Sequence, residues 1–166
     1  NKTVGYETRN DCFAGFAFGG ERALSMAKIG DGEIARVVVT EWTLNAMSHY
    51  QAHREQFDAE GSATVYVSTG GTLTRGQTDH IEQVVARTDA KDVLLAHDAD
   101  ENGEAMAAQL SERLAGSSVR IERAAPEQGS KGWNEQIQRE QQQQREREPL
   151  EAGVRNRGGS QAELGG

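Results

Sequence analysis

Short apolar segments alternate with longer amphipathic segments through the middle of the chain, and this order limits the fold more than any other feature. Segments rich in β-branched residues predict strands at 35–40, 64–68, 92–97 and 118–122. Segments with apolar residues at helical spacing predict helices at 43–57, 74–87 and 101–114. This repeated strand-helix order favours an α/β, Rossmann-like fold, with a parallel four-stranded sheet flanked by helices on both faces.

Each predicted helix has an inner face that is defined by apolar side chains. These side chains are Leu44, Ala46 and Met47 in the first helix, Ile81, Val84 and Val85 in the second, and Met106, Leu110 and Leu114 in the third. Gly116 follows the third helix and is expected to cap its C-terminus. His49, His53 and His80 have no metal-ligand spacing to one another and are expected at the surface.

The first 32 residues are rich in glycine and aromatic residues and predict a separate β-hairpin. Val4–Thr8 and Cys12–Phe18 alternate in the manner of strands, and Asn10-Asp11 between them suits a turn. The chain begins with Asn1 rather than Met, so we expect it to be a piece of a longer protein.

The last part of the chain is strongly polar after one short apolar segment. A helix is expected from Lys131 to about Glu148, with Trp133 and Ile137 one turn apart, and disorder is expected from Glu151 onward. The predicted division is an N-terminal hairpin extension at 1–32, an α/β domain at 33–137, and a polar helical or disordered tail at 138–166.

Composition narrows the classes of function. The net charge of −8 at pH 7 disfavours unaided binding to nucleic acid, so a metal ion or another domain would have to offset the repulsion. The single cysteine, Cys12, allows no internal disulfide and suits a reducing compartment. No apolar run approaches the roughly 20 residues that span a bilayer, so no membrane partner is expected.

Polar and acidic residues follow three of the predicted strands directly. Glu41 follows the first strand, Ser68–Gly71 follows the second, and Asp98–Gly103 follows the third. The carboxyl ends of parallel strands share one edge of a sheet, where ligands bind, so these residues are expected to converge. Alternate residues of an extended segment point the same way, so Asp98 and Asp100 can face one ion. Mg²⁺ or Mn²⁺, which prefer hard oxygen ligands, are the expected cofactors.

Several of these residues have more than one interpretation. Glu41 serves either as a third metal ligand or as a general acid/base. Gly70 and Gly71 allow close approach to a phosphate or simply a tight turn. An isolated D-x-D pair is usually a solvated turn, and Asp100 is also placed to cap the third helix. Arg75 and Lys131 either contact a phosphate or are simply solvated charges. His97 either packs against a helix or supports the site.

Together these segments resemble the signature of the Toprim family. Val37–Glu41, Ser68–Gly71 and Leu94–Gly103 match its strand-terminal Glu, its central Gly turn and its D-x-D-x-x-G motif. The resemblance implies a Toprim-like fold in which Glu41, Asp98 and Asp100 support Mg²⁺-dependent making or breaking of phosphodiester bonds. Further similarity at 4–20 and 129–134 is to the flanks of the Toprim core in relaxase- and primase-like proteins of plasmid mobilisation and conjugation.

The resemblance therefore implies a DNA-processing module in the bacterial cytoplasm that is helped by other domains of its parent protein. Three departures from that group's pattern stand out: Asn45 and Gly132 replace aspartates, and Trp42 replaces a small residue. They motivate a second hypothesis, a non-catalytic scaffold that docks partners in a DNA-transfer complex. A third, a receiver-like phosphoacceptor, requires paired acids after the first strand and a lysine after a fifth strand. Only Glu41 follows the first strand here, and no fifth strand is predicted.

Overall fold

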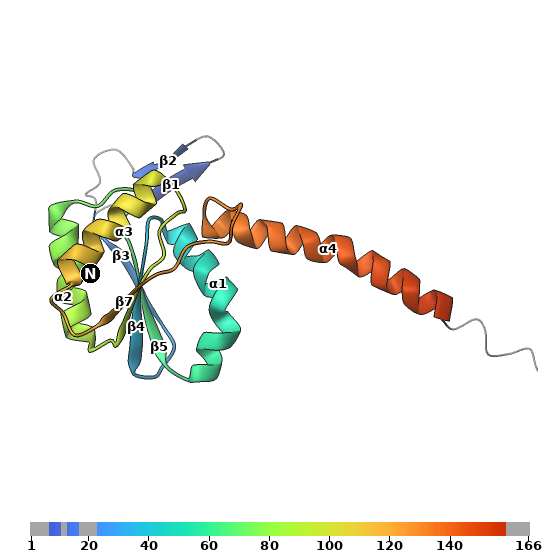
Figure 1. Cartoon of the computed structure of the whole chain (residues 1–166), viewed down its shortest axis with the longest axis horizontal. Coiled ribbons are helices and arrows are strands. Elements are labelled where there is room, and N and C mark those ends of the chain that lie inside the picture. The colour runs from blue at the N-terminus through green and yellow to red at the C-terminus, as the bar shows by residue number, and fades with distance from the viewer. Residues whose placement is uncertain (1–6, 11–12, 17–22, 159–166) are drawn as a thin grey trace, which may run out of the picture.

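The computed structural model describes the backbone of residues 7–10, 13–16 and 23–158, and the side chains of residues 23–147. The described strands form a two-stranded sheet and a five-stranded sheet, with helices on both faces of the larger one (Figure 1). In chain order the elements are β1 (Glu7–Asn10), β2 (Phe13–Phe16), β3 (Ser25–Ile29), β4 (Ile34–Thr40), α1 (Thr43–Glu60), β5 (Ala63–Ser68), α2 (Arg75–Thr88), β6 (Asp92–Leu95), α3 (Glu101–Leu114), β7 (Arg120–Arg123) and α4 (Trp133–Gly158).

The larger sheet has the strand order β3-β5-β4-β6-β7. Strands β5, β4, β6 and β7 are parallel, as the strand-helix alternation predicts. The prediction of only four strands is wrong, because β3 adds an antiparallel edge strand that pairs Ser25 with Ser68 and Ile29 with Thr64. Residues 25–28 are exposed and lack β-branched side chains, so pairing with β5 rather than local propensity makes β3 a strand. β3 precedes the parallel strands in the chain, so it is not the fifth strand, followed by a lysine, that a receiver-like phosphoacceptor requires.

The core has two parts, one on each face of the sheet. Val37 and Val39 of β4 pack with α2 and α3, and the predicted inner residues Ile81, Val85, Leu110 and Leu114 are all buried there. On the opposite face, Val38, Tyr66 and Ala96 pack with Ala46 of α1 and Trp133 of α4. Because β4 is covered on both faces, its sequence is a continuous apolar run rather than an alternating one.

The inner face of α1 differs from the predicted one. Ala46 is buried, but Met47 is 63% exposed, and the buried positions also include Asn45, Ser48 and His49. His49, expected at the surface, is fully buried, with its Nδ1 3.0 Å from the Tyr66 hydroxyl and its ring edge-on to Trp133. Local periodicity could not indicate this face, because α4 arrives from far along the chain to cover it.

The first turns of helix α4 attach it to the body. The indole Nε1 of Trp133 donates to the Ala96 carbonyl at 3.0 Å, and Ile137 is also buried. Beyond these residues the helix projects away from the sheet (Figure 1). Hydrogen bonds one turn apart, such as Gln142 to Glu146 at 3.1 Å, support this polar part. The prediction of disorder from Glu151 is wrong as far as Gly158, and residues 159–166 lie outside the described part.

The predicted N-terminal hairpin is confirmed in the residues that are described. β1 and β2 pair antiparallel, with Glu7 opposite Phe16 and Asn10 opposite Phe13. Asn10 is therefore a strand residue rather than a turn residue, and residues 1–6, 11–12 and 17–22 lie outside the described part. Helix α3 ends at Leu114 as predicted, but its C-cap is Ala115 rather than Gly116. None of the helices in the described residues has both the length and the apolar character to cross a membrane.

Candidate metal centre

The turn after β5 holds the backbone of Glu41 at the end of β4. Gly70 and Gly71 both donate their N–H groups to the Glu41 carbonyl, at 2.6 and 3.1 Å. Both glycines have positive φ values, 77° and 89°, which other residues rarely adopt. The turn also packs on Trp42, since a β-carbon at Gly71 would lie 2.8 Å from the indole Cη2. Both N–H groups are therefore occupied, and the turn itself serves to fix Glu41.

The two aspartates after β6 each have protein partners. Asp98 Oδ1 accepts a hydrogen bond of 2.6 Å from the side-chain amide of Asn45. Asp100 caps α3, because its Oδ1 accepts the Gly103 N–H at 2.9 Å, and its Oδ2 lies 3.0 Å from the Lys131 ammonium. The structure therefore confirms that Asp100 is a helix cap, and the cap leaves the second oxygen directed at a cation.

Glu41 is nearly fully buried beside these aspartates. Asn102 links it to the glycine turn, with its amide 3.5 Å from Glu41 Oε1 and 3.4 Å from the Gly71 carbonyl. Burial, and after it the negative charges of Asp98 and Asp100, raise the pKa of Glu41 from 4.5 to about 7. The pKa of Asp100 is held below its usual value, first by the Gly103 N–H and then by Lys131.

Replacing Glu41 by glutamine is expected to stabilise the metal-free protein at alkaline pH. The pKa of Glu41 is about 7 in the folded state against 4.5 ordinarily, so the folded state binds more protons between these values. Wild-type stability then falls as the pH rises from about 4.5 to about 7, and Glu41→Gln removes this loss. We expect a gain of about 2 kcal/mol at pH 8 and almost none at pH 4, measured by urea unfolding in chelator.

Glu33→Gln is the matched control for that comparison. Glu33 lies just before β4, at the other end of the same strand, and is exposed. Glu33→Gln removes the same charge as Glu41→Gln. If the stability of both variants depended on pH in the same way, the effect would come from net charge rather than from the site. An unchanged stability of Glu41→Gln at pH 8 would contradict the convergence of the three acids.

The loop that bears both aspartates is clamped by Arg123, the last residue of β7. Its guanidinium donates to the carbonyls of Leu95, His97 and Asp98 at 2.9 to 3.0 Å, and to Glu104 at 2.7 Å. We did not predict this residue from the sequence. Its only signal is its position, an arginine at the carboxyl end of a parallel strand, where the site residues also lie.

His97 lies in the loop that follows β6. The side chain is fully buried, which lowers the pKa of His97 to about 4 and leaves the ring neutral at pH 7. Neither ring nitrogen has a hydrogen-bond partner among the described residues. The contribution of His97 that the structure shows is therefore its backbone carbonyl, which Arg123 binds.

Two of the three departures from the resembled pattern meet at Asp98. Asn45 donates to the Asp98 carboxylate, whereas an aspartate in its place would repel it. Gly132 lies beside the same carboxylate, and a β-carbon there would be 2.8 Å from Asp98 Oδ1. In place of two further acids, Asp98 therefore has one hydrogen-bond donor, Asn45, and one residue without a side chain, Gly132.

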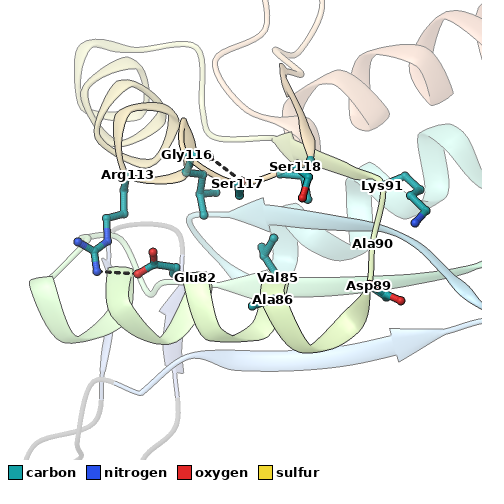
Figure 2. A pocket seen from close by; sticks show the side chains of 12 residues that line it. Glu82, Val85, Ala86, Asp89, Ala90, Lys91, Arg113, Gly116, Ser117 and Ser118 are labelled. Carbon is teal, nitrogen blue, oxygen red and sulfur yellow. Dashed lines mark hydrogen bonds and ion pairs between the residues drawn. The ribbon is translucent and has the colours of Figure 1, made fainter.

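Arg75 and two of the cavities involve residues other than the three carboxylates. Arg75 is exposed at the start of α2 and lines a cavity of about 650 Å³ with residues of α2 and α3. A second cavity, of about 540 Å³, lies before strands β6 and β7, where Arg113 pairs with Glu82 at 2.6 Å (Figure 2). Because strand amino ends border this cavity, it lies at the opposite edge of the sheet from Glu41.

The donor chemistry of the site fits a hard divalent cation. Carboxylate oxygens are the preferred ligands of such a cation. The pKa of Glu41 is raised first by burial and then by the charges of Asp98 and Asp100, and a cation would offset these charges. No group of three or more His, Cys, Asp or Glu side chains in the described part of the chain is arranged to hold a metal ion directly. Mg²⁺ usually takes only one or two protein carboxylates plus waters and phosphates, so Asp98 and Asp100 suffice.

Comparison with known proteins identifies a family. The family model described as Toprim-like matches residues 38–137, which is more than half of the chain and includes Glu41, Asp98 and Asp100. A search of curated proteins finds no match to the chain. At the family level the match supports a metal-binding, nucleic-acid-processing module. The chain belongs to the Toprim-like family.

Proposed function

We propose that this chain is the Toprim module of a DNA-processing protein of the plasmid-mobilisation, conjugative-transfer or primase-like type. It binds Mg²⁺ or Mn²⁺ and makes or breaks phosphodiester bonds in DNA. The observation that carries the proposal is the meeting of Glu41, Asp98 and Asp100 at the carboxyl edge of the sheet, where their charges act on one another. Such a cluster suits a bound cation better than it suits a stable apoprotein.

The residues divide into three roles. Asp98 and Asp100 are the metal ligands, and a bound ion would neutralise phosphate charge and stabilise an attacking or leaving oxygen. Glu41, whose pKa lies near 7, is suited to take up or release a proton near neutral pH, with metal ligation as its other role. Lys131 is the proposed phosphate contact, and Arg75 and the turn at Gly70 and Gly71 are proposed to flank the same DNA strand.

The charge of the chain indicates how this module would meet its substrate. A net charge of −8 opposes the DNA backbone, so other domains of a bacterial cytoplasmic parent protein are proposed to supply most of the affinity. The metal centre then acts on a phosphodiester that has already been delivered to the carboxyl edge of the sheet.

The test is a set of Mg²⁺-dependent cleavage and primer-synthesis assays on the parent protein. Asp98→Asn and Asp100→Asn are each expected to lower the rate by on the order of 100-fold or more, the scale on which one preorganised charge group acts. Asp92→Asn is the control, because Asp92 begins the same strand at its opposite end and pairs with Arg120. Activity that survives both site variants would remove this centre from the mechanism.

A non-catalytic scaffold is the second candidate, and the partners of the aspartates favour it. Asp98 is hydrogen-bonded to Asn45 and Asp100 is paired with Lys131, so both carboxylates have partners without a metal. A scaffold of this kind would keep its partner binding in Asp98→Asn while the wild-type parent shows no metal-dependent turnover. Metal-dependent turnover that Asp98→Asn abolishes would reject it.

A further inference from the structure

Lys131 has a fixed backbone and an accessible side chain. Its carbonyl accepts the Ala99 N–H at 2.7 Å, and its own N–H donates to the Glu135 carboxylate at 2.8 Å. The backbone of Lys131 is therefore held between the aspartate loop and the first turn of α4. Its side chain is 67% exposed, so the ammonium can move on a four-carbon stem while the stem's origin stays in place.

The ammonium occupies the oxygen of Asp100 that a metal would use. Asp100 Oδ1 is engaged by the Gly103 N–H, and Oδ2 contacts Lys131 at 3.0 Å. The charges of Asp98 and Glu41 also act on Lys131, so the lysine serves all three acids as a cation. An exposed ion pair of this type is weak and is readily exchanged for a divalent cation.

We infer that Lys131 is a displaceable counter-cation, which holds Asp100 until a metal ion takes that carboxylate and then binds a phosphate oxygen of the substrate. This inference rests on the proposed function and adds an order of events to it. Metal binding removes the lysine's carboxylate partner, and the released ammonium lies beside the metal on a fixed backbone. Phosphate binding by Lys131 thereby becomes dependent on the metal.

The inference requires opposite effects of one substitution on two ligands. Lys131→Met keeps the length of the side chain and removes its charge, so Mn²⁺ no longer competes with a resident cation for Asp100. We expect calorimetry to show that Mn²⁺ binds on the order of tenfold tighter to the variant. A neighbouring charge changes the proton affinity of a carboxylate by at least about this factor, and we expect a similar change in its metal affinity. The same variant should lose most of the gain in affinity for a short single-stranded oligonucleotide that Ca²⁺ produces in the wild type.

Two further variants isolate the cause. Lys91→Met removes an equal charge at the opposite edge of the sheet, beside the cavity of Figure 2, and should change neither affinity. Lys131→Arg keeps a cation and should restore the Ca²⁺-dependent gain. If Lys131 had only a structural role, Lys131→Met would weaken the binding of Mn²⁺ and of the oligonucleotide together, because the disturbed loop would bind neither ligand.

The outcomes separate this inference from the proposed function. Mn²⁺ affinity that is unchanged or weaker in Lys131→Met, or an oligonucleotide gain that survives the substitution, would overturn the inference alone. Wild-type protein that binds no Mn²⁺ at millimolar concentration would overturn both the inference and the proposed function. Tighter metal binding together with a lost oligonucleotide gain would support the inference.

Discussion

Gly103→Ala should lower the free energy of unfolding by about 3 kcal/mol, although alanine is the better helix former by about 1 kcal/mol. Gly103 lies in the first turn of α3, directly against the aspartate loop. A β-carbon there would collide with the Asp98 carbonyl oxygen and lie 3.0 Å from the Asp98 carbonyl carbon. Both are backbone atoms, so the loop rather than a flexible side chain has to shift. Urea unfolding followed by circular dichroism measures the loss.

Gly76→Ala is the matched control for this substitution. Gly76 also lies in the first turn of a helix, α2, but a β-carbon there would meet nothing within 4 Å. It should leave stability unchanged or raise it by up to about 1 kcal/mol, because only helix propensity changes. If both variants were equally stable or more stable than the wild type, the contact between α3 and the Asp98 backbone would not exist as described.

Arg123→Gln should cost about 3 kcal/mol of stability, because it removes the charged donor that several backbone carbonyls share. The guanidinium of Arg123 binds the carbonyls of Leu95, His97 and Asp98 and the carboxylate of Glu104. A glutamine is too short and has too few N–H groups to reach this set. The freed loop should also bind Mn²⁺ more weakly in the protein that remains folded, as calorimetry below the unfolding temperature would show.

Arg120→Gln, two residues earlier on β7, is the control for Arg123. Arg120 is 74% exposed and pairs with Asp92 at 2.8 Å. Exposed pairs contribute about 0 to 1 kcal/mol, so this variant should stay close to the wild type in stability and in metal affinity. If both variants lost the same stability and the same Mn²⁺ affinity, the effect would come from any change in β7, and the hydrogen bonds of Arg123 to the aspartate loop would make no contribution of their own.

The position of the candidate site could be predicted from the sequence because it follows from strand order. The carboxyl ends of parallel strands meet at one edge, so Glu41 and the Asp98 loop must be neighbours once β4 and β6 are adjacent. The buried strands and the inner faces of α2 and α3 could also be predicted from the sequence, since each repeats apolar residues at a regular spacing. These features depend only on local pattern and on the rules of parallel sheets.

The features that sequence reasoning missed depend on contacts between distant segments. β3 becomes a strand by pairing with β5, and its residues 25–28 contain no β-branched side chain. The inner face of α1 is polar because Trp133 and Tyr66 cover His49 from elsewhere in the chain. Arg123 and Asn102 support the site through the reach of their side chains, which no periodicity encodes.

A titration of the isotope-labelled chain with Mg²⁺, followed by amide NMR, tests the central claim that Asp98 and Asp100 hold a metal ion beside Glu41. The amide signals of Glu41 and of residues 98–103 should move and saturate at millimolar metal, and the shifts should vanish in Asp98→Asn. Signals of residues 116–118, at the opposite edge of the sheet, should stay in place. Site signals that do not move at millimolar Mg²⁺, or that move equally in Asp98→Asn, would contradict the metal centre.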